Sequence, residues 1–396
     1  MKTLEGDKGR LTKHFIILEG AFFPIVYLLE GAYSQMMHSL GYSDSFTGVA
    51  LSVEGIVALF LLPVAGYIAD KTLKYRFMLT AALFTLAVVT PVFFGFYDKS
   101  WVAFGFTCIE MCIINTTINI IDSWVTKLKS QSCDVDYGRI RAIGSISYAV
   151  ASVILSWIME KLGYGSIIWM VLITAGISIY AVLALPNPTT KTPQKVSVVE
   201  SAKVLFKNKN YVALLVCGFL FNIPSSAMRL FCSRLFSELG ADVAFTGVAF
   251  FLMAGSEFVI IRRFTCIADK LGTLNILTLG MLGMGVKLLA LAISPSKWLS
   301  LALMLLQAVS FGFCTPGVIR FVGEQIPEKY IASAILLFNS LGSGLAQILC
   351  SPIFGIISEK YSVRTMYACS SIPGFIAALI FWLYFRKQQK PQTVEQ

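Results

Sequence analysis

Long apolar stretches separated by short polar segments run along the whole chain of 396 residues. A helix needs roughly 20 mostly apolar residues to cross a bilayer, because each residue adds only about 1.5 Å. Twelve stretches meet this length, so the pattern predicts twelve transmembrane helices. Their predicted bounds are 14–38, 45–69, 76–97, 101–127, 140–160, 163–185, 210–236, 242–266, 272–294, 298–323, 330–357 and 364–386.

The composition favours the same class of protein. Apolar residues make up 56% of the chain and charged residues 14%, against about 45–50% and about 25% in soluble domains. A disordered chain is excluded, because disorder requires low hydrophobicity. A single soluble core is disfavoured, because soluble chains of this size divide into domains with polar surfaces. The composition therefore indicates an all-α membrane protein.

The basic residues predict the orientation. Of 32 Lys and Arg residues, 24 fall in segments that lie inside if the N-terminus is cytoplasmic, and only five fall in the outside loops. An excess of Lys and Arg in short loops marks the cytoplasmic side. We predict that both termini are cytoplasmic. The net charge of +10 then reflects membrane topology, and we expect a lipid bilayer and no nucleic acid as a partner.

One connection differs from the other, short ones. Residues 186–209 begin with three prolines and continue with a Lys-rich stretch. This change of composition predicts a boundary between two halves. We predict an N-terminal six-helix bundle over 1–185, a cytoplasmic linker over 186–209, and a C-terminal six-helix bundle with a short cytoplasmic tail over 210–396.

The chain also matches itself at an offset of 199 residues, in four blocks that share one register. Each half holds six predicted spans, an even number, so the two repeats are expected to be parallel. The matching blocks are 40–41 with 239–240, 46–50 with 245–249, 68–71 with 267–270, and 160–161 with 359–360.

The segment from Gly66 to Arg76, Gly-Tyr-Ile-Ala-Asp-Lys-Thr-Leu-Lys-Tyr-Arg, resembles the signature that the major facilitator superfamily carries between its second and third spans. Two parallel six-helix repeats are also the architecture of that superfamily. The resemblance implies a site between the halves near the midplane and transport by rocking of one half against the other. It also implies that Gly66, Asp70, Lys71, Arg76 and Asp269 serve the cytoplasmic gate.

A second segment resembles a narrower group. Asp136 to Ser145, Asp-Tyr-Gly-Arg-Ile-Arg-Ala-Ile-Gly-Ser, is similar to the Tyr/Phe-Gly-Arg-x-Arg-x-x-Gly segment of the lactose permease-like oligosaccharide–proton symporters. Their wider relatives include phenylpropionate- and nucleoside-type permeases. The resemblance covers essentially the whole chain. It implies a transporter, not an enzyme, in a bacterial cytoplasmic membrane, commonly monomeric, with a small solute and a proton as partners.

Ionisable residues inside the predicted spans are the candidate site residues. A charge at the bilayer centre costs about 2.5–3.5 kcal/mol on insertion scales, so such residues are retained mainly for function. They are Glu19, Glu30, Glu54, Glu110, Asp122, Arg229, Arg234, Glu257 and Lys287, with Arg141 at the entrance of a span.

The family resemblance implies that Asp122 and Arg141 bind the sugar and that Tyr148 supplies the aromatic surface on which it stacks. A guanidinium offers forked donors to neighbouring hydroxyls, and a carboxylate accepts from them. Asn115 and Asn119 share a narrow arc of one helix with Asp122 and are expected to line the same cavity. The alternative is that Asp122 and Arg141 form a structural ion pair between two helices.

Three further residues are candidates for coupling or binding. Glu257 matches a carboxylate common in span eight of these relatives, and Lys287 stands where they carry Arg in span nine. The resemblance implies a coupling role for this pair, and a buried structural salt bridge is the alternative. Glu30 lies in the first span, which lines the cavity in this superfamily, so we expect it at the substrate site.

The sequence departs from the family in span ten. The lactose permease-like proton relay uses a His and a Glu three residues later, whereas this chain has Gln307 and Ser310. Neither side chain titrates near neutral pH. Another intramembrane carboxylate would have to carry the proton, and Glu30, Glu54 and Glu257 are the candidates.

Other functions remain open. Uptake of a nucleoside or an aromatic acid is the nearest alternative, and an anionic substrate would be favoured if Arg229, Arg234 and Lys287 were unpaired. Uniport without a cation is a second alternative. Drug efflux is disfavoured, because efflux cavities are largely apolar. The chain has no HExxH, GxSxG or CxxC motif and only two His, so we expect no enzyme activity, metal or cofactor.

Overall fold

The computed structural model describes residues 8–130, 135–189 and 198–389. The first half of the chain folds into α1 (Lys8–Val26), η1 (Tyr27–Gly31), α2 (Tyr33–Ser39), α3 (Asp44–Thr72), α4 (Tyr75–Phe96), α5 (Ser100–Ser130), α6 (Tyr137–Leu162), η2 (Tyr164–Ser166) and α7 (Ile167–Ala184). The short helix α8 (Val198–Lys207) follows in the predicted linker.

The second half contains α9 (Lys209–Glu238), α10 (Val243–Leu271), α11 (Thr273–Ile293), α12 (Lys297–Leu303), η3 (Met304–Leu306), α13 (Gln307–Gln325), η4 (Glu328–Tyr330), α14 (Ile331–Phe338), η5 (Asn339–Gly344), α15 (Leu345–Lys360) and α16 (Val363–Gln389). Among the described residues, twelve helical segments are long and apolar enough to cross a membrane. The predicted number of spans is confirmed, and the chain is a multi-pass membrane protein.

The first span is less regular than we predicted from 14–38. The α-helix ends at Val26, and the five residues Tyr27–Gly31 form a turn of π-helix that contains Glu30. A bend at Ala32 then leads into α2. A second π-helical segment, Asn339–Gly344, separates α14 from α15. Such turns are rare and frequently lie at functional sites.

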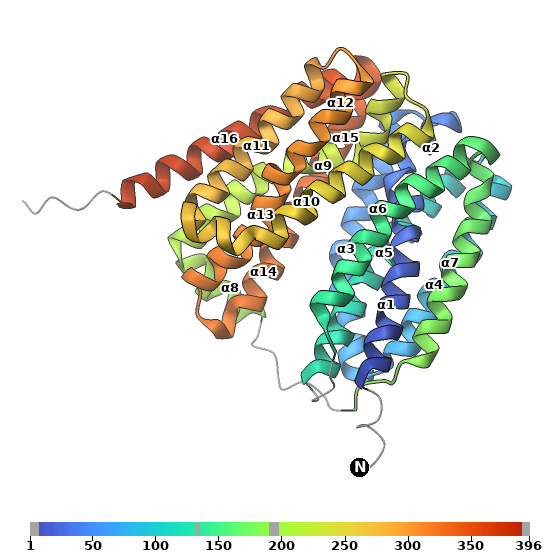
Figure 1. Ribbon diagram of the computed structural model, residues 1–396, viewed down its shortest axis with the longest axis horizontal. Helices are drawn as coiled ribbons and strands as arrows, with labels where there is room; N and C mark the ends of the chain where they lie inside the picture. Colours follow the sequence, from blue (N-terminus) through green and yellow to red (C-terminus); the bar gives the residue numbers. More distant parts are fainter. Residues whose placement is uncertain (1–7, 131–134, 190–197, 390–396) are drawn as a thin grey trace, which may run out of the picture.

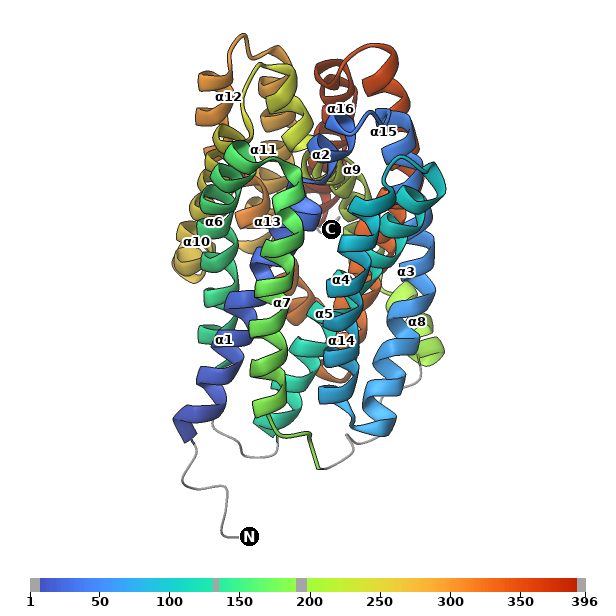
Figure 2. The ribbon, with the colours of Figure 1, turned by 90° about the vertical axis from the view of Figure 1, so that its right-hand side faces the viewer.

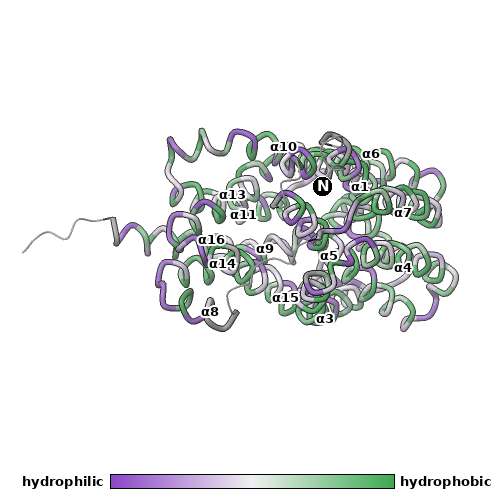
Figure 3. Tube along the Cα trace, turned by 90° about the horizontal axis from the view of Figure 1, so that it is seen from below, coloured by the Kyte–Doolittle hydropathy of each residue, from purple (hydrophilic) through white to green (hydrophobic). Residues whose placement is uncertain are grey.

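The two halves of the chain lie side by side, and the repeat found in the sequence organises their contact. In Figure 1 the helices up to α7 form one group and those from α9 onward form the other. Seen from below in Figure 3, α3 lies beside α15, and α6 lies beside α10. The two helix pairs are equivalent in the internal repeat. A shift of 199 residues carries α3 onto α10 and α6 onto α15, so the contact of α3 with α15 has the same form as the contact of α10 with α6.

The closest approach between the halves occurs at glycines in equivalent positions. A Cβ at Gly48 would collide with the carbonyl oxygen of Ser351, and a Cβ at Gly247 would collide with that of Ser152. Positions 48 and 247 differ by the repeat offset, as do 152 and 351. Glycine is required at both positions because any side chain would push the helices apart.

The halves are joined at one end of the bundle, where α3 and α10 begin and where α6 and α15 end. We call this the closed end. The carboxylate of Glu359, at the end of α15, accepts a hydrogen bond from the backbone N–H of Ser45 at 3.0 Å. Glu160, at the end of α6, accepts one from the N–H of Val243 at 2.9 Å. Each carboxylate thus caps the first turn of a helix in the opposite half.

At the opposite end, which we call the open end, α3 ends at Thr72 and α10 at Leu271. The ribbons of the two halves diverge toward this end in Figure 1, and Figure 2 shows the helices of the first half standing beside one another along the same direction. A cavity of about 510 Å³ on α10 is lined by Phe258, Val259, Arg262 and Arg263. The open end carries the basic connections of the sequence, among them Lys71, Lys74 and Arg76.

Candidate functional site

Polar side chains from both halves form one hydrogen-bonded chain inside the membrane-spanning part. Arg229 of α9 donates from Nη1 to Oε1 of Glu30 at 2.6 Å and from Nη2 to Oε1 of Gln347 at 2.6 Å. The Nε2 of Gln347 donates to Oε2 of Glu54 at 2.6 Å. Asn115 completes the chain by donating from Nδ2 to Oε1 of Glu54 at 3.4 Å. We call these five residues the cross-half network.

The carboxylates of the cross-half network are buried or largely buried and therefore need these hydrogen bonds. The side chain of Glu54 is 1% exposed, and Glu30 is 19% exposed. Removing such charges from water is costly unless opposite charges and hydrogen bonds compensate. The network brings together four candidate residues predicted from the sequence, Glu30, Glu54, Asn115 and Arg229. It also contains Gln347, which could not be predicted from the sequence because an uncharged amide in a span does not stand out from its neighbours.

A further carboxylate lies close to this network. Glu110 of α5 is fully buried, and neither of its carboxylate oxygens has a hydrogen-bond partner in the described structure. It acts electrostatically with Glu30 and Glu54. Glu110 is one of the intramembrane residues that the sequence marks as candidates for the site.

A second polar cluster lies where α1, α5 and α6 meet. Nη1 of Arg141 is 3.5 Å from Oε2 of Glu19, and its guanidinium lies over the ring of Phe23 at 4.9 Å. Asp122 accepts a hydrogen bond from the hydroxyl of Tyr137 at 3.2 Å. The ion-pair partner of Arg141 in the structure is therefore Glu19 and not Asp122, although Asp122 remains near enough to act on Arg141 electrostatically.

The physical reason is the close packing of α1 on α6. Gly144 has no side chain, and the carboxylate of Glu19 occupies the space that a Cβ there would need. This brings Glu19 within reach of Arg141, one helical turn earlier on α6. The Nη1 of Arg141 and the Oε2 of Glu19 are both without a hydrogen-bond partner in the described structure.

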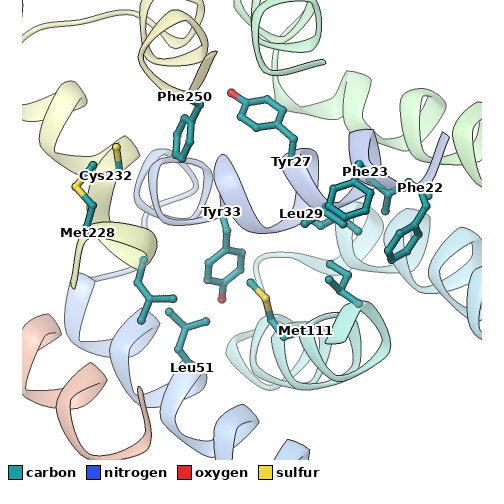
Figure 4. Close-up of a cluster of buried hydrophobic side chains, with 14 of the residues drawn as sticks. Phe22, Phe23, Tyr27, Leu29, Tyr33, Leu51, Met111, Met228, Cys232 and Phe250 are labelled. Atoms are coloured by element: carbon teal, nitrogen blue, oxygen red, sulfur yellow. The ribbon is translucent and has the colours of Figure 1, made fainter. Parts of the chain in front are cut away.

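Tyr148 belongs to an aromatic cluster built from both halves. Its ring meets the ring of Tyr27 edge to face, with centroids 5.6 Å apart, and the ring of Phe250 at 6.4 Å. Tyr27 and Phe250 also touch, at 5.7 Å, and Figure 4 shows them facing each other among the buried side chains. The hydroxyl of Tyr27 is hydrogen-bonded to that of Ser156. Tyr27 begins the π-helical turn that carries Glu30, so this cluster adjoins the cross-half network.

Glu257 and Lys287 lie around a common amide. Lys287 is fully buried, and its Nζ donates to Oε1 of Gln307 at 2.6 Å. The side chain of Gln307 is also hydrogen-bonded to Glu257. Gln307 thus lies between the two charged residues, Glu257 and Lys287, for which the sequence predicts a joint role in coupling. The residue that replaces the family's histidine holds this cluster together.

Another cation within the spans, Arg234, has a carboxylate partner at the closed end. Its Nε lies 3.3 Å from Oδ1 of Asp44. Asp44 accepts a further hydrogen bond from the hydroxyl of Ser358 at 2.5 Å, across the two halves. Together with the contacts above, this means that Arg229, Arg234 and Lys287 are all engaged by acceptors of this protein.

The residues predicted for the gate lie at the open end. Nη2 of Arg76 donates to the carbonyl of Leu183 at 2.5 Å, and Lys71 lies 5.5 Å from the ring centre of Tyr67. Asp269 forms an ion pair with Arg320 at 2.7 Å. Gly66 and Asn119 line a small cavity of about 30 Å³ between α3 and α5. The side chain of Asp70 lies outside the described part of the structure.

Comparison with known proteins now places the chain in a family. Residues 23–369 match the model of the MFS_1 like family. The chain belongs to the MFS_1 like family. It is similar to an uncharacterized transporter, YwbF, of Bacillus subtilis, with 25% identity over 96% of each chain. It is also similar to the maltose permease of Geobacillus stearothermophilus, with 26% identity over 93% of this chain and 92% of the permease.

The fold agrees with this membership. The crystal structure of the nucleoside transporter NupG superposes with a TM-score of 0.79 at 19% identity, covering 95% of this chain and 99% of that chain. This member of the MFS_1 like family is therefore a transporter of the major facilitator type, and it is not an enzyme. Its relatives are named as carriers of small molecules.

Proposed function

We propose that this protein takes up an uncharged polyhydroxylated solute, an oligosaccharide or a glycoside, together with a proton across a bacterial cytoplasmic membrane. The similarity to the maltose permease over nearly the whole chain supports a sugar. The excess of basic residues at the open end supports an orientation in which this end and both termini face the cytoplasm. The structure then corresponds to the inward-open state of an alternating-access cycle.

One observation carries the choice of an uncharged, hydroxyl-rich substrate. The cations Arg229, Arg234 and Lys287 are occupied by the protein's own acceptors, so none is free to neutralise a substrate carboxylate. In contrast, Nη1 of Arg141 and Oε2 of Glu19 face each other at 3.5 Å without forming a hydrogen bond, and neither atom has another hydrogen-bond partner in the part of the chain that the structure describes. A donor fork beside an acceptor suits the vicinal hydroxyls of a sugar.

We assign the roles accordingly. Arg141 and Asp122, joined now by Glu19, bind hydroxyl groups of the substrate, and Tyr148 supplies an aromatic surface. Asn119 on the exposed side of α5 contributes an amide. In the cross-half network, Glu30 and Asn115 line the substrate path where the halves meet.

Coupling and gating residues complete the proposal. Glu54, Glu257 and Lys287 link substrate binding to the rearrangement of the two halves. Gly66, Asp70, Lys71, Arg76 and Asp269 act at the cytoplasmic gate, and a single copy of the chain suffices for transport.

The test is the external pH of lightly buffered, de-energised cells that express the protein. We expect maltose or another compound from a panel of disaccharides and glycosides to make the medium more alkaline, because the proton enters with the sugar. Asp122→Asn should abolish this signal. Asp98→Asn, a matched change at an exposed position, should leave it intact. Uptake of the labelled sugar without any change of pH would overturn proton coupling.

Nucleoside uptake is the second candidate, because a ribose also presents vicinal hydroxyls and carries no charge. The structural likeness to NupG supports the fold that such a function would use. Alkalinisation by uridine alone, with no response to any sugar, would replace the sugar by a nucleoside. An aromatic acid is disfavoured by the paired cations, and drug efflux by the polar network in the spans.

A further inference from the structure

The buried carboxylate of Glu110 stands apart from the acidic residues of the cross-half network. Its side chain is completely inaccessible, and both of its oxygens lack a hydrogen-bond partner in the described structure. An ionised carboxylate in this position would lose its hydration and gain nothing in return, which is prohibitively costly in a protein interior. The neutral carboxylic acid avoids most of this cost. The geometry therefore requires that Glu110 carry a proton in this conformation.

Other titratable groups lie around Glu110 on the neighbouring elements. Glu54 of α3 and Glu30 of the π-helical turn both act on it electrostatically, and Tyr33 of α2 lies close enough to be affected by it. Arg229 is the nearby cation, and it is already bound to Glu30 at 2.6 Å. On α5 itself the neighbouring titratable groups are the thiols of Cys108 and Cys112.

The carboxylate of Glu54, unlike that of Glu110, accepts hydrogen bonds. Its Oε2 accepts from Gln347 at 2.6 Å and its Oε1 from Asn115 at 3.4 Å. Hydrogen-bond donors of this kind stabilise the ionised form of a carboxylate. The two carboxyls lie on the packed helices α3 and α5 and act on each other electrostatically, and their different surroundings favour a single proton that resides on Glu110 while Glu54 is ionised.

We propose that Glu110 is the binding site of the transported proton and that Glu54 exchanges this proton with it. This inference rests on the proposed function, because it supplies the proton site that the missing His and Glu of span ten leave unassigned. The exchange belongs to the conformation in which α15 has separated from α3: the O–H bond of a protonated Glu54 breaks as an O–H bond forms on the carboxylate of Glu110, and the reverse step returns the proton. No other reactant is needed.

The cross-half network explains how the proton would be coupled to transport. Gln347 belongs to the opposite half, so its hydrogen bond to Glu54 exists only while α15 lies against α3. Separation of these helices removes one donor from Glu54 and raises the proton affinity of the carboxyl pair. A proton affinity that differs between two conformations is, by linkage, a coupling between proton binding and the conformational change.

The first experiment uses purified protein in proteoliposomes with labelled maltose as the probe. For one proton per sugar, a gradient of one pH unit supports up to about tenfold accumulation. Glu110→Gln mimics the permanently protonated state. We expect it to exchange labelled for unlabelled maltose at a rate near that of the wild type, because exchange needs no net proton movement, and to lose accumulation entirely. Glu238→Gln, an exposed matched control, should keep both activities.

A second measurement needs no substrate. Infrared difference spectra of the purified protein, recorded while the pH is raised, should show loss of a carboxylic acid band in the wild type that is absent in Glu110→Gln. If Glu110→Gln does not fold, Glu110→Asp keeps the carboxyl group, and the band should persist with a changed pH dependence.

The outcomes separate the two proposals. Accumulation driven by a pH gradient in the wild type that is undiminished in Glu110→Gln would overturn the proton site and leave symport standing. A band assigned to Glu110 in a wild type that transports no sugar would refute the proposed substrate and support the proton site. Accumulation driven by sodium and indifferent to pH would refute both proton coupling and this role of Glu110.

Discussion

The ion pair between Arg229 and Glu30 joins the two halves, so its removal should shift the balance between conformations. The Nη1 of Arg229 and the Oε1 of Glu30 are 2.6 Å apart, and the two side chains are 39% and 19% exposed. Removing one partner of a fully buried pair costs about 3–5 kcal/mol, whereas an exposed pair contributes about 0.2–1 kcal/mol. Because this burial lies between the two limits, we expect Arg229→Gln to cost about 2 kcal/mol.

The substitution destabilises only the conformation in which the two halves are in contact at the closed end. Since about 1.4 kcal/mol corresponds to a factor of ten, the population that is open at this end should rise about 30-fold. Ser34 reports on it, because its hydroxyl is buried against that of Ser233 at 2.8 Å. In a Ser34→Cys protein with the exposed Cys266 and Cys369 changed to Ser, a membrane-impermeant maleimide added outside should react about 30 times faster.

Arg263→Gln is the matched control, because Arg263 is exposed and lines the cavity on α10. It should leave the labelling rate unchanged. If Arg229→Gln left the rate within about twofold of the starting protein, the reasoning would be refuted, because the pair would then contribute nothing to closure. A rise of the same size with Arg263→Gln would show that the reagent reports lost charge and not lost contact.

Three further predictions concern packing and burial. Gly48→Val and Gly247→Val should each abolish maltose uptake at normal membrane levels, because the halves can no longer meet at the closed end; uptake equal to the wild type would contradict the close approach. Gln307→Leu should lower the unfolding temperature of the detergent-solubilised protein by several degrees, because the buried ammonium of Lys287 loses its acceptor. Gln307→Glu keeps an acceptor and should not lower this temperature. Asp269→Asn should change that temperature by less than about two degrees, since it removes only an exposed ion pair, and a larger drop would show an unrecognised structural role.

The hydrophobic pattern was sufficient for the spans because a bilayer demands a length of apolar helix that no other environment requires. The number of spans agrees, and the bounds of most segments differ by only a few residues. The break in the first span could not be predicted in this way. Tyr27–Gly31 is apolar except for Glu30, and a π-helical turn inserts an extra residue without any change in hydrophobicity.

The sequence predicted which charged residues lie in the spans, and it did not predict which of them form ion pairs or hydrogen bonds with one another. Intramembrane carboxylates and cations are visible in a sequence, but which of them meet depends on how helices pack. The ion pair of Arg141 with Glu19 is an example, because nothing in the sequence predicted that these two residues would meet. One pairing did leave a signal, because Glu30 and Arg229 are separated by the repeat offset of 199. Equivalent residues near the axis of a two-fold repeat necessarily face each other.

That geometry has a consequence for the way the closed end is built. The contacts of Gly48 with Ser351 and of Gly247 with Ser152 have the form of an isologous interface, in which each partner presents the same surface to the other, as in a symmetric dimer. On the axis of a true dimer two identical side chains must meet. Ser34 and Ser233 could do so in separate identical subunits, but two glutamates or two arginines would repel each other. Joining both copies in one chain allows Glu30 to oppose Arg229, so the axis can carry an attractive charge pair that a homodimer cannot form.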